Sequence, residues 1–103
     1  MKQKNNKIQY DEELLKHFCI KHHIKKLGFF GSVIRSDFNS KSDIDIIVEF
    51  EDGHTPGFFS LYDMEVELSS IFENRKVDLR TKEDLSHFFR DDVVENMQVH
   101  YEA

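Results

Sequence analysis

Two aspartates, Asp43 and Asp45, stand two positions apart at the start of an apolar run that ends at Phe50. Side chains of a β-strand alternate between its faces, so both carboxylates would lie on one face while Ile44 and Ile46 lie on the other. Neighbouring carboxylates repel each other, and a hard divalent cation with oxygen ligands commonly offsets that repulsion. This pattern is typical of metal-assisted phosphoryl or nucleotidyl transfer.

A Gly-Ser pair, Gly31 and Ser32, follows a short apolar run and precedes the two aspartates. Glycine lets a ligand approach the backbone closely, a serine hydroxyl can donate a hydrogen bond, and a helix N-terminus favours anions. The pair therefore suits the phosphates of a nucleotide, although an ordinary turn has the same composition. Arg35 lies one turn beyond and could pair with phosphate; a salt bridge with Asp37 or with the aspartate pair is the equal alternative.

A third candidate acid, Asp78, lies in the alternating segment 76–81, where Val77 and Leu79 share the opposite face. If this strand pairs beside the strand that carries Asp43, the carboxylate of Asp78 can share a face with the aspartate pair. Asp78 would then be a metal ligand or the general base for an incoming hydroxyl. A solvent-facing acid without a chemical role is the alternative.

The hydrophobic pattern also predicts the elements that must position these residues. In chain order they are a helix from Asp11 to about His23, strands over 27–30 and 43–50, a helix over 58–72, a strand over 76–81 and a final helical region from Thr81 to nearly Tyr101. The strand over 43–50 is expected in the middle of the sheet. Cys19 is expected in the core, and His17, His22 and His23 at the surface, because their spacing is poor for chelation.

Composition limits the possible functions. The chain has 103 residues, of which 39% are hydrophobic, which suits one domain with a real core. Its charge is +4 over residues 1–26 and −10 over residues 27–103, and that acidity disfavours direct binding of nucleic acid. There is neither an apolar run of membrane-spanning length nor a secretory signal, so a cytoplasmic protein is expected. Residues 1–8 are expected to form a solvated, flexible tail.

The residues Gly31-Ser32, ten intervening positions and then Asp43-Ile44-Asp45 resemble the G-S-x10-D-x-D motif of the minimal nucleotidyltransferases, a branch of the DNA polymerase β-like superfamily. The match extends over GFFGSVIRSDFNSKSDIDIIVEF, and VDLRT follows at the expected distance. This resemblance implies one domain over residues 1–103, with an α+β fold in which helices pack on a small mixed sheet of three to four strands.

The resemblance also implies the composition of the site. Magnesium, as a two-metal site, would be held by Asp43, Asp45 and Asp78, with ATP as the nucleotide donor. Gly31 and Ser32 would hold the nucleotide phosphates.

The same family includes proteins that pair with HEPN-domain proteins in toxin–antitoxin systems. For this chain the resemblance implies an antitoxin that transfers AMP from ATP to a tyrosine hydroxyl of a HEPN RNase toxin. The alternatives are a small-molecule nucleotidyltransferase of the antibiotic-modifying kind and an antitoxin that only binds its partner. A protein acceptor is favoured because little of the chain is left to enclose a small one; Phe38, Phe58 and Phe59 could form its contact patch or pack internally.

Overall fold

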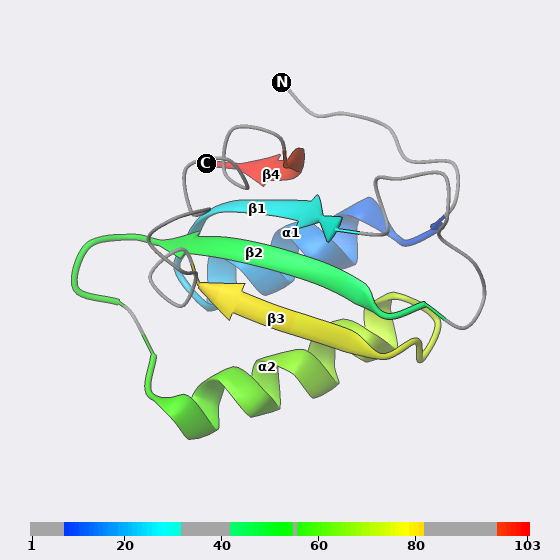
Figure 1. The fold of residues 1–103 in the computed structure, drawn as a ribbon. Coiled ribbons are helices and arrows are strands. Elements are labelled where there is room, and N and C mark those ends of the chain that lie inside the picture. The colour runs from blue at the N-terminus through cyan, green and yellow to red at the C-terminus, as the bar shows by residue number, and fades with distance from the viewer. Residues whose placement is uncertain (1–7, 32–41, 55, 82–96) are drawn as a thin grey trace.

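The computed structural model describes residues 8–31, 42–54, 56–81 and 97–103, the side chains of Phe58 and Phe59 excepted. Their elements, in chain order, are α1 (Glu12–Lys21), β1 (Ile24–Phe30), β2 (Ile44–Phe50), α2 (Phe58–Ile71), β3 (Val77–Thr81) and β4 (Gln98–Glu102) (Figure 1). The strands form one sheet in the order β3-β2-β1-β4; β1 is antiparallel to β2 and β4, and β2 is parallel to β3. This mixed sheet with helices confirms the predicted α+β fold, with β2 in its interior.

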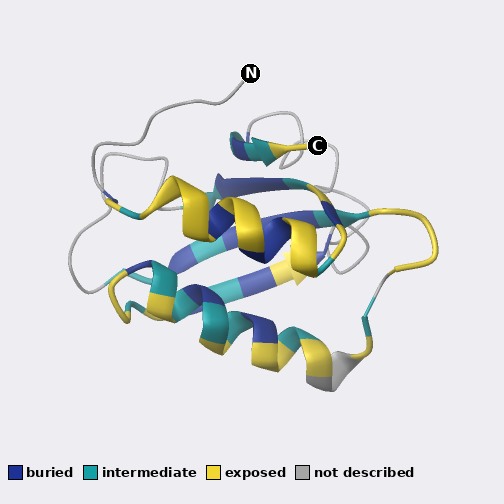
Figure 2. Ribbon diagram, turned by 180° about the vertical axis from the view of Figure 1, so that it is seen from behind, coloured by how far each residue is buried: buried dark blue, intermediate teal, exposed yellow. Residues whose placement is uncertain are grey.

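Both helices cover the same face of the sheet and lie in front of it in Figure 2. The core fills the space between them: Ile44, Ile46 and Val48 alternate along β2 and are all 0% exposed. The helices contribute Leu15, Phe18, Cys19, Met64 and Leu68 to the same cluster, and Phe72, directly after α2, completes it. Cys19 is thus a core residue, as predicted. The alternation leaves the other face of β2, which carries Asp45, directed away from the helices.

Helix α1 begins where the sequence predicts. The Asp11 carboxylate accepts hydrogen bonds from the backbone N–H groups of Glu13 and Leu14, at 2.9 and 3.3 Å, which caps the helix N-terminus. The helix ends at Lys21 rather than His23. His23 has a left-handed φ of 57°, which is incompatible with a right-handed α-helix.

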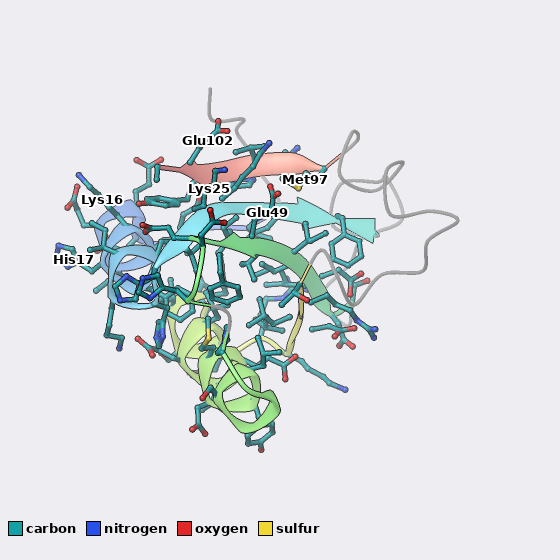
Figure 3. All side chains as sticks on the ribbon, turned by 90° about the vertical axis from the view of Figure 1, so that its left-hand side faces the viewer. Lys16, His17, Lys25, Glu49, Met97 and Glu102 are labelled. Carbon is teal, nitrogen blue, oxygen red and sulfur yellow. The ribbon has the colours of Figure 1, made fainter. Side chains whose placement is uncertain are left out.

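The histidines of this region are only partly as predicted. His17 is exposed and projects away from the sheet together with Lys16 (Figure 3), and His23 is exposed as well. His22 is a correction: its side chain is 25% exposed, and its Nε2 lies 3.1 Å from the Glu67 carboxylate of α2. His22 therefore links the two helices instead of belonging to the open surface.

The predicted final helix is wrong over Gln98–Tyr101, which belongs to β4; residues 82–96 lie outside the described part of the chain. Pairing with the free edge of β1 overrides the helical periodicity of this segment. Gly28 permits it, because a side chain there would lie 2.9 Å from the Met97 sulfur. Met97 instead packs with Ile47 on the sheet face opposite the helices.

A buried hydrogen-bond network ties the start of the described chain to β4. The Tyr10 hydroxyl lies 2.6 Å from Nδ1 of His100, and Nε2 of His100 lies 3.0 Å from Oε1 of Gln98. Because an amide oxygen only accepts, Nε2 donates to Gln98, and in a neutral imidazole Nδ1 then accepts from the Tyr10 hydroxyl. Burial, aided by the charge of Glu12, raises the pKa of Tyr10 to about 12. Ile8, assigned to the tail from the sequence, is 5% exposed and belongs to the core.

No helix in the described ranges is long and apolar enough to cross a membrane.

Candidate active site

The register of the sheet brings the candidate residues of three strands to one end of it. Asp45 of β2 pairs with Phe30, the last residue of β1, and also with Asp78 of β3. Gly31 follows Phe30 directly. The strand that carries Asp78 does pair beside β2, which was the condition for Asp78 to share a face with the aspartate pair, and the apolar neighbours of Asp45 and Asp78 occupy the core face. Asp45 and Asp78 are side-by-side residues on the sheet face that the helices leave uncovered.

Gly31 is in direct contact with the Asp45 carboxylate. Its φ is +69°, and a Cβ at this position would lie 2.5 Å from Oδ2 of Asp45. Both the backbone conformation and the space therefore require glycine. From the sequence, Gly31 was expected to leave room for a phosphate; the structure adds that it leaves room for this acid.

Two basic side chains, Lys76 and Arg80, form ion pairs with Asp43 and Asp78. Arg80 engages both oxygens of Asp78, with Nε 3.3 Å from Oδ1 and Nη2 3.4 Å from Oδ2, and Nζ of Lys76 lies 3.8 Å from Oδ2 of Asp43. The side chains of Asp43 and Asp78 are 46% and 37% exposed, so water screens these pairs and they contribute little stability. Such pairs can be exchanged for other partners at small cost.

Lys76 and Arg80 were not singled out from the sequence. A signal for them exists, since positions 76, 78 and 80 alternate with the buried Val77 and Leu79 and must share a face with Asp78.

Hydrogen bonds hold the segment before β2 against the segment before β3. The backbone N–H of Ile44 donates to the Lys76 carbonyl at 2.9 Å, and Nη2 of Arg75 donates to the Ser42 carbonyl at 2.9 Å. The Ser69 hydroxyl, near the end of α2, donates to the Arg75 carbonyl at 2.6 Å. These bonds fix the register that sets Asp45 opposite Asp78.

The described residues suit a magnesium ion in part. Within the described ranges, no three histidine, cysteine or acidic side chains are grouped so that they could hold a metal. Magnesium in nucleotide-dependent enzymes is usually bound by one or two carboxylates, with phosphate and water oxygens completing the shell. Asp45 and Asp78, oxygen donors on adjacent strands and one face, fit that requirement. Asp43, also predicted as a ligand, lies directly before β2 with its carboxylate 3.8 Å from Nζ of Lys76, and its role as a ligand stays a prediction.

Other predicted residues fall outside what the structure describes. Ser32 and Arg35, expected to bind phosphate, and Phe38, expected near a partner, lie within the segment 32–41. Phe58 begins α2, as the sequence indicated, but its side chain and that of Phe59 are not described. These assignments stay predictions.

Comparison with known proteins identifies the family. Residues 11–100 match the family model described as nucleotidyltransferase domain. Two proteins of Methanocaldococcus jannaschii that carry the name putative protein adenylyltransferase are similar in sequence. The first is 38% identical over 77 residues, covering 72% of this chain and 76% of that protein. The second is 42% identical over 59 residues, covering 57% of this chain and 65% of that protein.

Solved structures share the fold. One, described as a putative minimal nucleotidyltransferase, superposes with a TM-score of 0.68 at 26% identity and covers 84% of this chain and 85% of its own. Another, a toxin–antitoxin crystal structure with AMP-PNP, gives a TM-score of 0.72 at 21% identity over 90% of this chain and 74% of its own. The family model covers most of the chain and agrees with the resemblance seen in the motif, so the chain belongs to the nucleotidyltransferase domain family.

Proposed function

We propose that this chain is a magnesium-dependent adenylyltransferase and the antitoxin of a two-protein system. It transfers AMP from ATP to a tyrosine hydroxyl of a HEPN-domain RNase toxin and so neutralises the toxin. The observation that carries the proposal is the register that sets Asp45 opposite Asp78 and against Gly31. The names of the sequence relatives support protein adenylylation, and the solved toxin–antitoxin neighbours, one with AMP-PNP, support the partner and the nucleotide.

In this proposal the three acids share one task, and Asp78 has a second. Asp43, Asp45 and Asp78 would hold magnesium, which would supply positive charge to offset that of the triphosphate and of the attacking and leaving oxygens. Asp78 accepts the proton of the tyrosine hydroxyl, whose oxygen forms a bond to the α-phosphorus of ATP as the bond to pyrophosphate breaks. Gly31, which has no side chain, lets the phosphates approach the backbone beside Asp45.

The ion pairs of the site fit this chemistry. Lys76 and Arg80 bring two positive charges to the acids that must meet a polyanionic substrate. Their pairs with Asp43 and Asp78 are partly exposed, so either cation can exchange its carboxylate for a phosphate oxygen when ATP arrives.

The proposal is tested by incubating the chain with the protein encoded in the neighbouring reading frame, ATP and magnesium, followed by intact-mass measurement and peptide mapping. We expect the partner to gain AMP on tyrosine, and to gain nothing when ATP is omitted. A partner that is bound tightly but unmodified would favour an antitoxin that only binds. A partner that is neither bound nor modified would favour a small-molecule nucleotidyltransferase.

One observation favours the binding-only antitoxin as the second candidate. Asp43 and Asp78 are both paired with basic side chains, and no group of three acids is assembled among the residues described. A protein of this kind would still inhibit the RNase activity of its partner after Asp45→Asn. An adenylyltransferase would lose most of that inhibition, because the substitution removes a charge without changing the side-chain shape.

A further inference from the structure

Asp78 lies between two basic residues on one face of the β3 segment. Lys76, Asp78 and Arg80 alternate with the buried Val77 and Leu79, so they share the sheet face that the helices leave uncovered. Residues two apart on a strand are separated by about 6.6 Å along it. Asp78 therefore has one cation on each side, and the two cations differ in position and in bonding.

The strand register places Lys76 at the nucleotide end of the sheet. Lys76 lies one position before Val77, which pairs with Ile44 at the start of β2. Gly31, where the phosphates are proposed to bind, follows the last residue of β1 at the same end. The Lys76 side chain is 80% exposed, and its Nζ lies 3.8 Å from Oδ2 of Asp43. Because this pair is long and open to water, Lys76 can turn to a phosphate at Gly31 at small cost.

Arg80 lies on the other side of Asp78, away from the nucleotide end. It pairs across the sheet with Ile47, which in turn pairs with Gly28 of β1. Its guanidinium turns back along β3, with Nε 3.3 Å from Oδ1 and Nη2 3.4 Å from Oδ2 of Asp78. Contacts from one planar group to both oxygens fix the plane of a carboxylate, which a single ammonium contact does not. Arg80 thus holds Asp78 from behind and does not stand between Asp78 and the nucleotide end.

The β3 backbone does not depend on this ion pair. The backbone N–H of Leu79, between Asp78 and Arg80, donates to Oε2 of Glu65 in α2 at 2.7 Å. The side chains of Arg80 and Asp78 are 49% and 37% exposed, so water screens their pair and it adds little stability. Loss of Arg80 should therefore release the Asp78 side chain and leave the strand in place.

We infer that Arg80 is a positioning residue for AMP transfer, which keeps the Asp78 carboxylate turned toward the acceptor hydroxyl. Lys76, and not Arg80, is the cation that exchanges its carboxylate for a phosphate oxygen. The inference rests on the proposed function, since it assigns a task within that reaction.

The test compares Arg80→Gln with Lys76→Gln, which each remove one positive charge from the same strand face. The measured quantities are the Kd for ATP with magnesium, the Tm, and the single-turnover rate of AMP transfer to the protein encoded in the neighbouring reading frame at saturating ATP. We expect Arg80→Gln to slow transfer about 10²-fold, as misplacement of a catalytic group by about 1 Å does, with a Kd for ATP within about twofold of wild type. Lys76→Gln should raise the Kd for ATP about tenfold, because it removes one charged hydrogen bond.

Two further variants separate orientation from charge. Arg80→Lys keeps the positive charge but loses the planar fork, so it should recover only a small part of the lost rate. In an Asp78→Asn background, Arg80→Gln should cost no further rate, because Arg80 acts through Asp78.

Three results would each overturn the inference. They are a wild-type rate in Arg80→Gln or Arg80→Lys, a Kd for ATP that rises as much in Arg80→Gln as in Lys76→Gln, and an added loss of rate in the Asp78→Asn background. If Arg80→Gln does not fold, Arg80→Lys decides by its rate in the same way. The proposed function fails separately: if wild type binds ATP and the partner without transferring AMP, the activity is wrong, and the two Kd values still decide which cation meets the phosphates.

Discussion

Replacing Gly31 by alanine should separate the chemistry of the site from the stability of the fold. The new Cβ would lie 2.5 Å from Oδ2 of Asp45, and ordinary contact begins near 3.4 Å, so the carboxylate must move by about 0.9 Å. A misplacement of about 1 Å in a catalytic group can cost about 10²-fold in rate. The left-handed φ of +69° adds about 1–2 kcal/mol of backbone strain.

Gly53 provides the matched control. Its φ is +80°, but a Cβ there would meet nothing within 4 Å, so Gly53→Ala carries similar strain without touching Asp45. Single-turnover transfer of AMP to the co-encoded protein, with thermal unfolding in parallel, compares the two variants. We expect similar losses of stability but a loss of transfer of about 10²-fold in Gly31→Ala alone. Transfer by Gly31→Ala within a few-fold of Gly53→Ala would refute the reasoning.

Three further predictions each concern one side chain. Asp78→Asn should keep ATP binding while slowing single-turnover transfer by about 10²- to 10⁴-fold, the usual contribution of a general base; a rate within a few-fold of wild type would show that the base lies elsewhere. Asp43→Ala should bind magnesium and ATP more weakly than wild type in calorimetric titration. Equal binding by wild type and Asp43→Ala would show that Asp43 is not part of the site. The pKa of Tyr10 is raised from 10.0 to about 12, so its contribution to stability should be complete below pH 10 and decline as the pH rises toward 12. Thermal unfolding should show a steeper alkaline decline in wild type than in Tyr10→Phe, which keeps only the contribution of Tyr101, whose pKa burial also raises. Identical pH profiles of the two proteins would contradict this prediction.

The face on which Asp45 and Asp78 lie was predictable, because apolar and polar residues alternate around both positions and one buried face fixes the other. The register that sets these two residues opposite each other was not, because local sequence does not show which strands pair. The contact between Gly31 and Asp45 was not, because it depends on which residues of β1 and β2 meet across the sheet. Local sequence shows that a glycine is present but does not show what fills the space beside it.

The C-terminal strand shows a different limit. The spacing of apolar residues up to Met97 has the period of a helix, and no residue near Gln98 indicates that a strand begins there. The strand forms because β1 has a free edge and because Gly28 leaves room for the Met97 sulfur. Both contacts join residues that lie far apart in the sequence. His100 was likewise not recognised as a core residue, since its burial depends on Tyr10 at the other end of the chain.

In the proposed function, Asp45 belongs to a site that transfers AMP to another protein. The most direct measurement supplies ATP labelled at the α-phosphate, magnesium and the co-encoded protein to wild type and to Asp45→Asn, and follows label on the partner in a single turnover. We expect rapid labelling by wild type and a loss of about 10²-fold or more in Asp45→Asn, with the fold retained. Equal labelling by the two proteins, or no labelling by wild type although the partner is bound, would contradict it.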